Sequence, residues 1–105
     1  RSRLPEATRT LEKATSFSND NPRIFNNLAI AYWQQEEIDS AVNAFLRALE
    51  IEPVNQEFIQ NLLQLLVQRK RWSEALPHAR RMVELMPDNQ QARSLLTQVE
   101  RAMIP

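Results

Sequence analysis

Apolar residues recur along this chain at the three- and four-residue spacing that marks one face of a helix. The first clear face carries Phe25, Leu28, Ala29 and Tyr32. A second face begins after the acidic pair at 36–37 and carries Ile38, Ala41, Phe45, Ala48 and Leu49. The pattern therefore predicts two amphipathic helices joined by a short turn.

The same pattern returns 34 residues further along the chain, where Leu28 falls on Leu62 and Pro53 on Pro87. The second copy of the pattern carries Ile59, Leu62, Leu63 and Leu66 before a basic turn, and Trp72, Ala75, Ala79, Met82 and Val83 after it. A helical hairpin of this length is too small to bury its own apolar face, so neighbouring hairpins must stack. The sequence therefore predicts a repeat array.

Asparagine and proline mark the ends of the repeated units. Asn21, Asn55 and Asn89 each stand just before an apolar periodic segment, and we expect each to cap the helix that follows. Asp39 and Ser73 are predicted to cap the second helix of each hairpin in the same way. The chain has no glycine, which disfavours the tight turns of strand hairpins and favours an all-α fold.

Large and small residues partly exchange places between the two units. Leu63 stands where Ala29 stood, and Ala79 stands where Phe45 stood, so the summed volume is roughly preserved. Ala41 is expected to let the two helices of the first hairpin approach closely. A larger side chain there would wedge the helices apart.

The residues at these positions carry a family resemblance. The segment from Pro22 to Pro53 resembles the tetratricopeptide repeat at almost every signature position, and the second unit resembles it more loosely. Both units carry another residue, Glu36 or Lys70, where the family commonly has a glycine in the mid-repeat turn. The resemblance implies an all-α, right-handed superhelical array of antiparallel helical hairpins, with 1–105 as one tetratricopeptide-like domain.

Two full repeats and two partial ones are expected within that domain. The full repeats span 22–55 and 56–89. Residues 4–19 read as the second helix of a half repeat, because Ala7, Leu11 and Ala14 follow the spacing of the later second helices. Residues 90–103 read either as a capping helix or as the first helix of a further repeat. Since the chain lacks an initiator methionine, we expect it to be a fragment of a longer array.

Composition disfavours several classes of function. Thirteen basic and thirteen acidic residues cancel, so nucleic acid and anionic membrane are not expected partners. The chain has no cysteine, its single histidine, His78, has no companion at metal-ligand spacing, and no nucleophile and base are paired. We expect no enzyme activity, no metal and no cofactor. The protein is expected to be soluble, with the cytoplasm as the favoured compartment, although the sequence does not determine it.

The resemblance also implies a binding surface, because in this family the first helix of each unit lines a concave groove that holds a peptide. The positions that match the groove are Arg23, Asn26, Asn27, Ile30, Trp33, Gln60, Asn61, Gln64, Gln68 and Leu95, with Gln34, Glu57, Val67, Gln91, Ser94 and Gln98 beside them. Side-chain amides dominate this set. An amide offers two donors and an acceptor, so a row of amides can pair with a peptide backbone whatever its side chains are.

Asn27 and Asn61 match the asparagine ladder of some family members, such as the O-linked GlcNAc transferases, and Leu95 interrupts that ladder at its third position. The alternative is that these amides only solvate an exposed face. Of the carboxylate clamp that other members use for acidic tails, only Asn61 is retained. Trp33 is expected either beside the groove as an interface anchor or packed between helices.

Basic residues gather around the second hairpin, namely Arg69, Lys70, Arg71, Arg80 and Arg81. A solvated turn and convex face are favoured over contact with phosphates or an acidic partner, because no aromatic residues are interleaved for bases to stack on. RNA binding in the manner of the related 35-residue helical repeats is disfavoured by the neutral charge and by the 34-residue period of this chain.

Two functions remain open at this point. The first is a protein-interaction module whose concave face binds a peptide from a protein partner of unknown identity. The alternative is a structural spacer or self-association segment of a larger protein, without a ligand of its own. The face carrying Leu11 favours this alternative, because a cut array would leave it uncovered and allow weak self-association.

Overall fold

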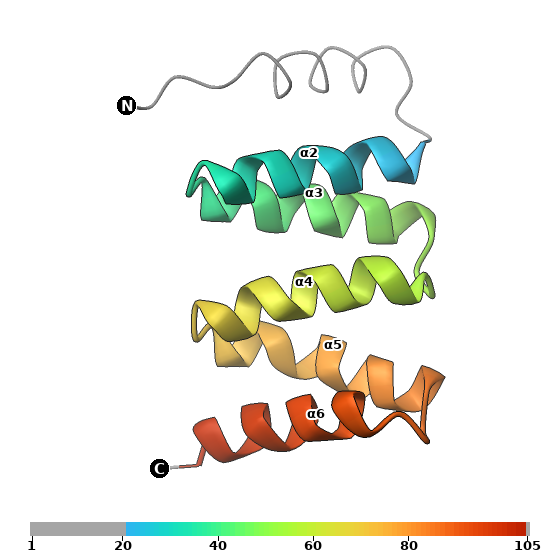
Figure 1. Ribbon diagram of the computed structural model, residues 1–105, viewed down its shortest axis with the longest axis vertical. Coiled ribbons are helices and arrows are strands. Elements are labelled where there is room, and N and C mark those ends of the chain that lie inside the picture. Colours follow the sequence, from blue (N-terminus) through green and yellow to red (C-terminus); the bar gives the residue numbers. More distant parts are fainter. Residues whose placement is uncertain (1–20, 105) are drawn as a thin grey trace. The chain divides into compact units, whose positions relative to one another are not determined.

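The computed structural model describes residues 21–104, and every regular element in that range is a helix (Figure 1). The helices are α2 (Pro22–Gln34), α3 (Ile38–Ile51), α4 (Gln56–Gln68), α5 (Trp72–Leu85) and α6 (Gln90–Ala102). The described residues include no strand, which confirms the all-α prediction. The predicted half repeat at 4–19, with Leu11, lies outside the described residues. None of the described helices is long and apolar enough to cross a membrane.

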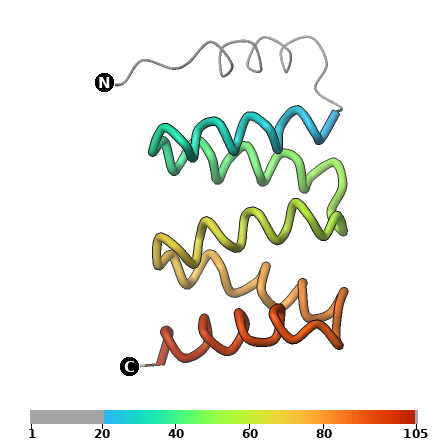
Figure 2. Tube along the Cα trace, viewed as in Figure 1, coloured from blue at the N-terminus to red at the C-terminus, as the bar shows by residue number. Residues whose placement is uncertain are grey.

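The chain divides into two compact units, Arg1–Phe58 and Ile59–Pro105, with the division inside α4. Within the first unit α2 and α3 form an antiparallel hairpin with a short turn (Figure 2). Within the second unit α5 packs against α6. The α2–α3 hairpin is thus the first of the two predicted hairpins.

Asparagine side chains begin three of the helices, as the sequence predicted. The Oδ1 atom of Asn21 accepts a hydrogen bond from the backbone N–H of Arg23 at 3.0 Å. Asn55 accepts from the N–H of Phe58 at 3.1 Å, and Asn89 from that of Ala92 at 2.9 Å. Each bond satisfies a backbone donor that the first turn of a helix leaves without a partner.

The predicted caps of α3 and α5 are wrong. The residues that precede these helices are Glu37 and Arg71, and neither makes a side-chain capping bond. Asp39 and Ser73 instead lie at the second position of their helices, because α3 begins at Ile38 and α5 at Trp72. The turns that end α2 and α4 fix these starting points.

Both turns have the same geometry, a Schellman motif with one residue in the left-handed region. That residue is Glu36 in the first turn, with φ 64°, and Lys70 in the second, with φ 59°. The N–H of Glu37 donates to the carbonyl of Tyr32 at 2.9 Å, and that of Arg71 to the carbonyl of Leu66 at 2.8 Å. The positions where the family commonly has glycine thus keep a glycine-like conformation without glycine.

The core contains the residues whose sizes exchange between the repeats. Ala29, Phe45, Leu63 and Ala79 are all 0% exposed, as is Ala41. The core residues that escaped the sequence analysis include Val42, Ala44, Phe58 and Leu65. The largest of these, Phe58, is 1% exposed and packs with Phe25 and Ala48. The signal for it was that α4 is apolar on more than one face, which is typical of a helix covered on several sides. The buried residues of α4 are Phe58, Ile59, Leu62, Leu63, Leu65 and Leu66.

Candidate functional site

One side of α2 is turned outward and carries mainly polar groups. Arg23, Asn27, Ile30 and Gln34, here called the α2 face, follow helical spacing. All are exposed except Ile30, which is partly buried. The opposite side of the helix holds Phe25, Leu28 and Ala29, which are buried. Packing of the apolar side therefore fixes which way the polar side points.

Asn26 does not belong to this face. Asn26 is only 1% exposed. Among the described residues, every buried side-chain nitrogen and oxygen has a hydrogen-bond partner. A ligand at the surface could not reach an amide so placed without disturbing the fold. The expectation that Asn26 lines the groove is therefore corrected, and the residue is assigned to the core.

A second row of amides runs along α4. Its members, here called the α4 face, are Glu57, Gln60, Asn61, Gln64 and Gln68. Glu57, Gln64 and Gln68 are exposed, while Gln60 and Asn61 are partly buried. Asn61 thus presents less surface than Asn27, although the two stand 34 residues apart at equivalent repeat positions.

Arg23 and Glu57 form a two-pronged ion pair within the first unit. The Nη1 and Nη2 atoms of Arg23 each donate to a different carboxylate oxygen of Glu57, both at 3.1 Å. The hydrogen bond from Arg23 is the main cause that lowers the pKa of Glu57, and the same bond raises the pKa of Arg23. The two residues stand 34 positions apart, so opposite charges at equivalent repeat positions were the sequence signal for this pair.

Aromatic rings lie beneath two arginines of the first unit. The guanidinium carbon of Arg23 is 5.3 Å from the centroid of the Phe58 ring, and that of Arg47 is 4.8 Å from the Phe25 ring. Arg47 also pairs with Glu50 at 3.5 Å on α3. Both rings belong to the same buried cluster, so each arginine covers one edge of the core.

Trp33 has a mixed environment. Its ring meets that of Phe45 edge to face, with centroids 6.3 Å apart. Phe45 is fully buried, whereas Trp33 is only partly buried. The indole therefore packs in the hairpin, as one of the two sequence-based alternatives had it, and also keeps surface that a partner could contact.

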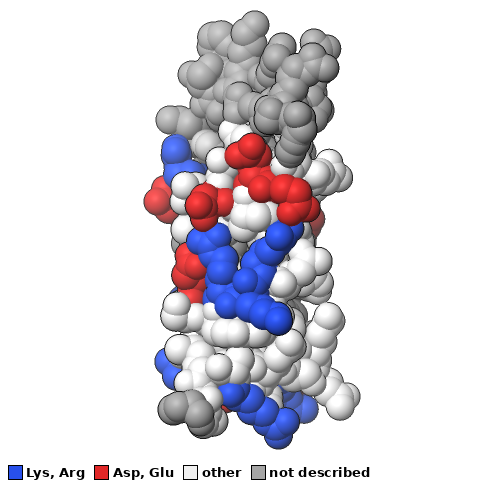
Figure 3. Space-filling view, turned by 90° about the vertical axis from the view of Figure 1, so that its left-hand side faces the viewer, with Lys and Arg blue, Asp and Glu red and all other residues white. Residues whose placement is uncertain are grey.

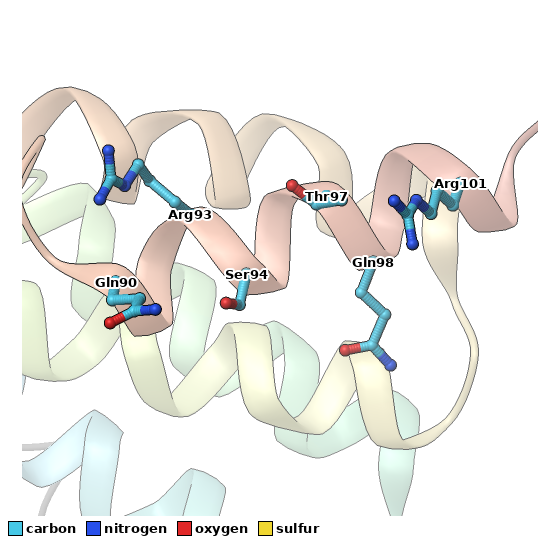
Figure 4. A pocket seen from close by; sticks show the side chains of 6 residues that line it. All are labelled: Gln90, Arg93, Ser94, Thr97, Gln98 and Arg101. Carbon is cyan, nitrogen blue, oxygen red and sulfur yellow. The ribbon is translucent and has the colours of Figure 1, made fainter.

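The last helix presents a polar, open surface (Figure 4). A depression of about 600 Å³ is lined by Gln90, Arg93, Ser94, Thr97, Gln98 and Arg101, all on α6. Four of the positions that matched the groove lie on α6. Gln91, Ser94 and Gln98 are exposed, and Leu95 is partly buried. A depression along one side of a single helix is too open to enclose a small molecule, so it resembles an interaction surface more than a ligand pocket.

Lysine and arginine side chains gather at the turn between α4 and α5 (Figure 3). Arg69 and Lys70 are exposed there, and Arg71 makes a two-pronged bond with Glu74 on the following helix turn. Among the described residues, no group of three histidine, aspartate or glutamate side chains could hold a metal ion. His78 on α5 is partly buried.

Comparison with protein families settles the identity of the fold. A tetratricopeptide repeat model matches residues 22–55, and a second model, described as a TPR repeat, matches residues 1–36. The chain belongs to the tetratricopeptide repeat family. Tetratricopeptide arrays are repeat proteins that present extended binding surfaces, so membership indicates a protein-interaction module.

Solved structures show the same fold. The first tetratricopeptide domain of Spaghetti, bound to an HSP90 peptide, matches with a TM-score of 0.75 and 21% identity, over 93% of this chain and 80% of that chain. The MamA RS-1 ArsTM double mutant matches with a TM-score of 0.82 and 22% identity, over 97% of this chain and 57% of its own. MamA AMB-1 matches with a TM-score of 0.80 and 23% identity, over 91% of this chain and 52% of that chain. This chain thus spans little more than half of MamA. Among curated proteins, none matches the sequence.

Proposed function

We propose that this tetratricopeptide repeat protein is a non-catalytic module that binds a peptide segment of a protein partner through the α2 face, and that the α4 face is a peptide-contacting surface in its own right. The observation that carries the proposal is the α2 face itself. Asn27 and Gln34 stand exposed on it while the other side of the helix is buried. An exposed amide can donate to a peptide carbonyl and accept from a peptide N–H at once.

The composition of both faces favours recognition of the peptide backbone over recognition of particular side chains. Asn27, Asn61, Gln60, Gln64 and Gln68 are neutral amides, and Ile30 and the exposed part of Trp33 offer limited apolar contact. Leu95 on α6 adds another partly buried apolar group. Binding is therefore expected to be tolerant of peptide sequence and weak. The structure of Spaghetti with an HSP90 peptide supports the proposal, since a domain of the same fold binds a peptide there.

The α2 face can be tested by mapping amide chemical shifts while a degenerate peptide library is added. Asn27→Ala is expected to weaken binding by about 0.5–1.5 kcal/mol, the typical net value of one hydrogen bond. Asn61→Ala is expected to act in the same direction. Asn43→Ala is the matched control, because Asn43 is an exposed asparagine on α3, outside both faces. Shift changes that cluster around Arg80 and Arg81 and spare Asn27 and Asn61 would contradict the proposal.

Self-association is less well supported. The surface that favoured it carries Ala7, Leu11 and Ala14, which lie outside the described residues. Light scattering over a concentration series tests this alternative independently. Growth of larger species that Leu11→Glu suppresses would favour it, whereas peptide binding by a monomer would favour the module.

A further inference from the structure

The two charged residues among the positions that match the groove neutralise each other. Arg23 is the one cation in that set and Glu57 the one anion, and all the others are uncharged. Two hydrogen bonds of 3.1 Å join them, with the side chains 53% and 54% exposed. A two-pronged arginine–carboxylate pair fixes geometry as well as charge. A peptide that reaches this surface therefore meets an ion pair that has no net charge.

The buried core holds this pair in place from below. Arg23 lies over the Phe58 ring at 5.3 Å, and Phe58 is 1% exposed and packs with Phe25 and Ala48. Rotation of the guanidinium toward a ligand would give up both the ring contact and the Glu57 bonds. Both contacts favour the paired position, and the hydrogen bond from Arg23 lowers the pKa of Glu57.

We infer that Glu57 sets the specificity of this surface: by occupying Arg23 it directs binding toward peptide segments without acidic groups. This inference rests on the proposed function. A peptide carboxylate that approached Arg23 would have to displace Glu57 or lie beside it. Displacement breaks both hydrogen bonds of Glu57, and the side-by-side arrangement places two negative charges on one guanidinium, so both arrangements are unfavourable. An uncharged peptide meets no such penalty.

The same geometry means that a substitution of Glu57 should make the hydrogen-bond donors of Arg23 accessible to a peptide. Removing its charge while keeping its shape would leave Arg23 over the Phe58 ring with its donors available. Glu57→Gln is therefore expected to create a preference for acidic peptides that the wild-type protein lacks. Arg47 and Glu50 provide the matched control, since they form another exposed arginine–glutamate pair with its arginine over a phenylalanine, but on α3.

The test uses two peptide probes of equal length. One is SRMEEVD, the peptide in the Spaghetti structure, and the other is SRMQQVN with an amidated carboxyl end, which lacks every acidic group. The dissociation constant of each is measured by fluorescence anisotropy for wild type, Glu57→Gln, the double variant Arg23→Gln/Glu57→Gln, and Glu50→Gln. The quantity compared is the ratio of affinities for the acidic and the neutral peptide.

Wild type is expected to bind the neutral peptide at least as well as the acidic one. Glu57→Gln should shift the ratio toward the acidic peptide by about two- to fivefold, the range of an exposed ion pair. The double variant should abolish that shift, and Glu50→Gln should cause none. A carbon-13 NMR titration of Glu57 checks that the pair exists in solution. The pKa of Glu57 should lie below its ordinary value in wild type and return toward that value in Arg23→Gln.

Two results would overturn the inference in distinguishable ways. If wild type prefers SRMEEVD and Glu57→Gln leaves the ratio unchanged, the proposed peptide surface stands but Glu57 does not set its specificity. If no variant binds either peptide while Glu57 still titrates low, the proposed function itself is contradicted, and the inference with it.

Discussion

The indole of Trp33 meets the ring of Phe45 edge to face, with the centroids 6.3 Å apart and the ring planes at 82°. Phe45 lies in the core of the α2–α3 hairpin at 0% exposure, whereas Trp33 keeps part of its surface exposed. One side chain thus joins the packing of the hairpin to its surface. The contribution of Trp33 to binding can therefore be measured only when its contribution to folding is measured as well.

Trp33→Ala is expected to destabilise the protein by about 1–3 kcal/mol, less than the loss of a fully buried tryptophan, because only part of the ring is covered. Trp33→Phe should cost less, since a smaller ring can still meet Phe45. Urea unfolding of both variants gives the two values. If Trp33→Ala had the same free energy of unfolding as wild type, the contact with Phe45 would add nothing to stability. That result would favour a role of Trp33 at the surface alone.

Replacing Glu36 or Lys70 by glycine should stabilise the protein. Both residues have positive φ, at 64° and 59°, a region that costs residues with a Cβ atom about 1 kcal/mol and costs glycine little. Each change is expected to raise the free energy of unfolding by about 0.5–1 kcal/mol.

Glu37→Gly is the matched control for that prediction. Glu37 is the next residue, is also exposed, and has an ordinary φ of −88°. Glycine there should bring no gain, because no strain is relieved and the unfolded chain becomes more flexible. Equal effects of Glu36→Gly and Glu37→Gly in thermal unfolding would argue against a left-handed residue in this turn.

The sequence predicted most of the fold because its periodic signals are local. Asn21, Asn55 and Asn89 cap their helices through their own side chains, so residue type and spacing were enough. The starts of α3 and α5 were missed because they depend on the left-handed turns at Glu36 and Lys70. Without glycine, nothing in the residue type marks that conformation.

The candidate site was less predictable because it depends on how each side chain packs. Asn26 and Asn27 are neighbours of the same type, yet one is buried and the other exposed. The rotation of α2 against its own hairpin decides between them, and periodicity defines that rotation only roughly. Glu57 was identified by position alone, whereas its bond to Arg23 required the distance between the helices.

Ala41→Leu should destabilise the first hairpin. Ala41 is 0% exposed on α3, which packs against α2, so a larger side chain has no free volume to enter. The expected loss is about 1–3 kcal/mol, typical of overpacking. Ala102→Leu, at an exposed position in α6, should change stability little. If chemical denaturation gave Ala41→Leu the same free energy of unfolding as wild type, the close approach of the two helices would not depend on a small residue at position 41.

His78 should make stability depend on pH in the mildly acidic range. Burial on α5 lowers the pKa of His78 below its ordinary value near 6.5, and the carboxylate of Glu74 opposes this shift only in part. In the unfolded chain the imidazole takes up its proton near pH 6.5, whereas the folded protein binds that proton only at lower pH. The contribution of His78 to stability is therefore complete above about pH 6.5 and is lost as the pH falls through the lowered pKa.

His78→Gln isolates this effect, because glutamine keeps a polar side chain but does not titrate. Urea unfolding at steps between about pH 8 and pH 5 should show wild type losing stability relative to the variant as the pH falls below about 6.5. Above that pH the difference between the two proteins should stay constant. Carboxylates that titrate at lower pH are common to both and cancel in the comparison. A difference that stays constant over the whole range would mean that the imidazole is as well solvated in the folded protein as in the unfolded chain.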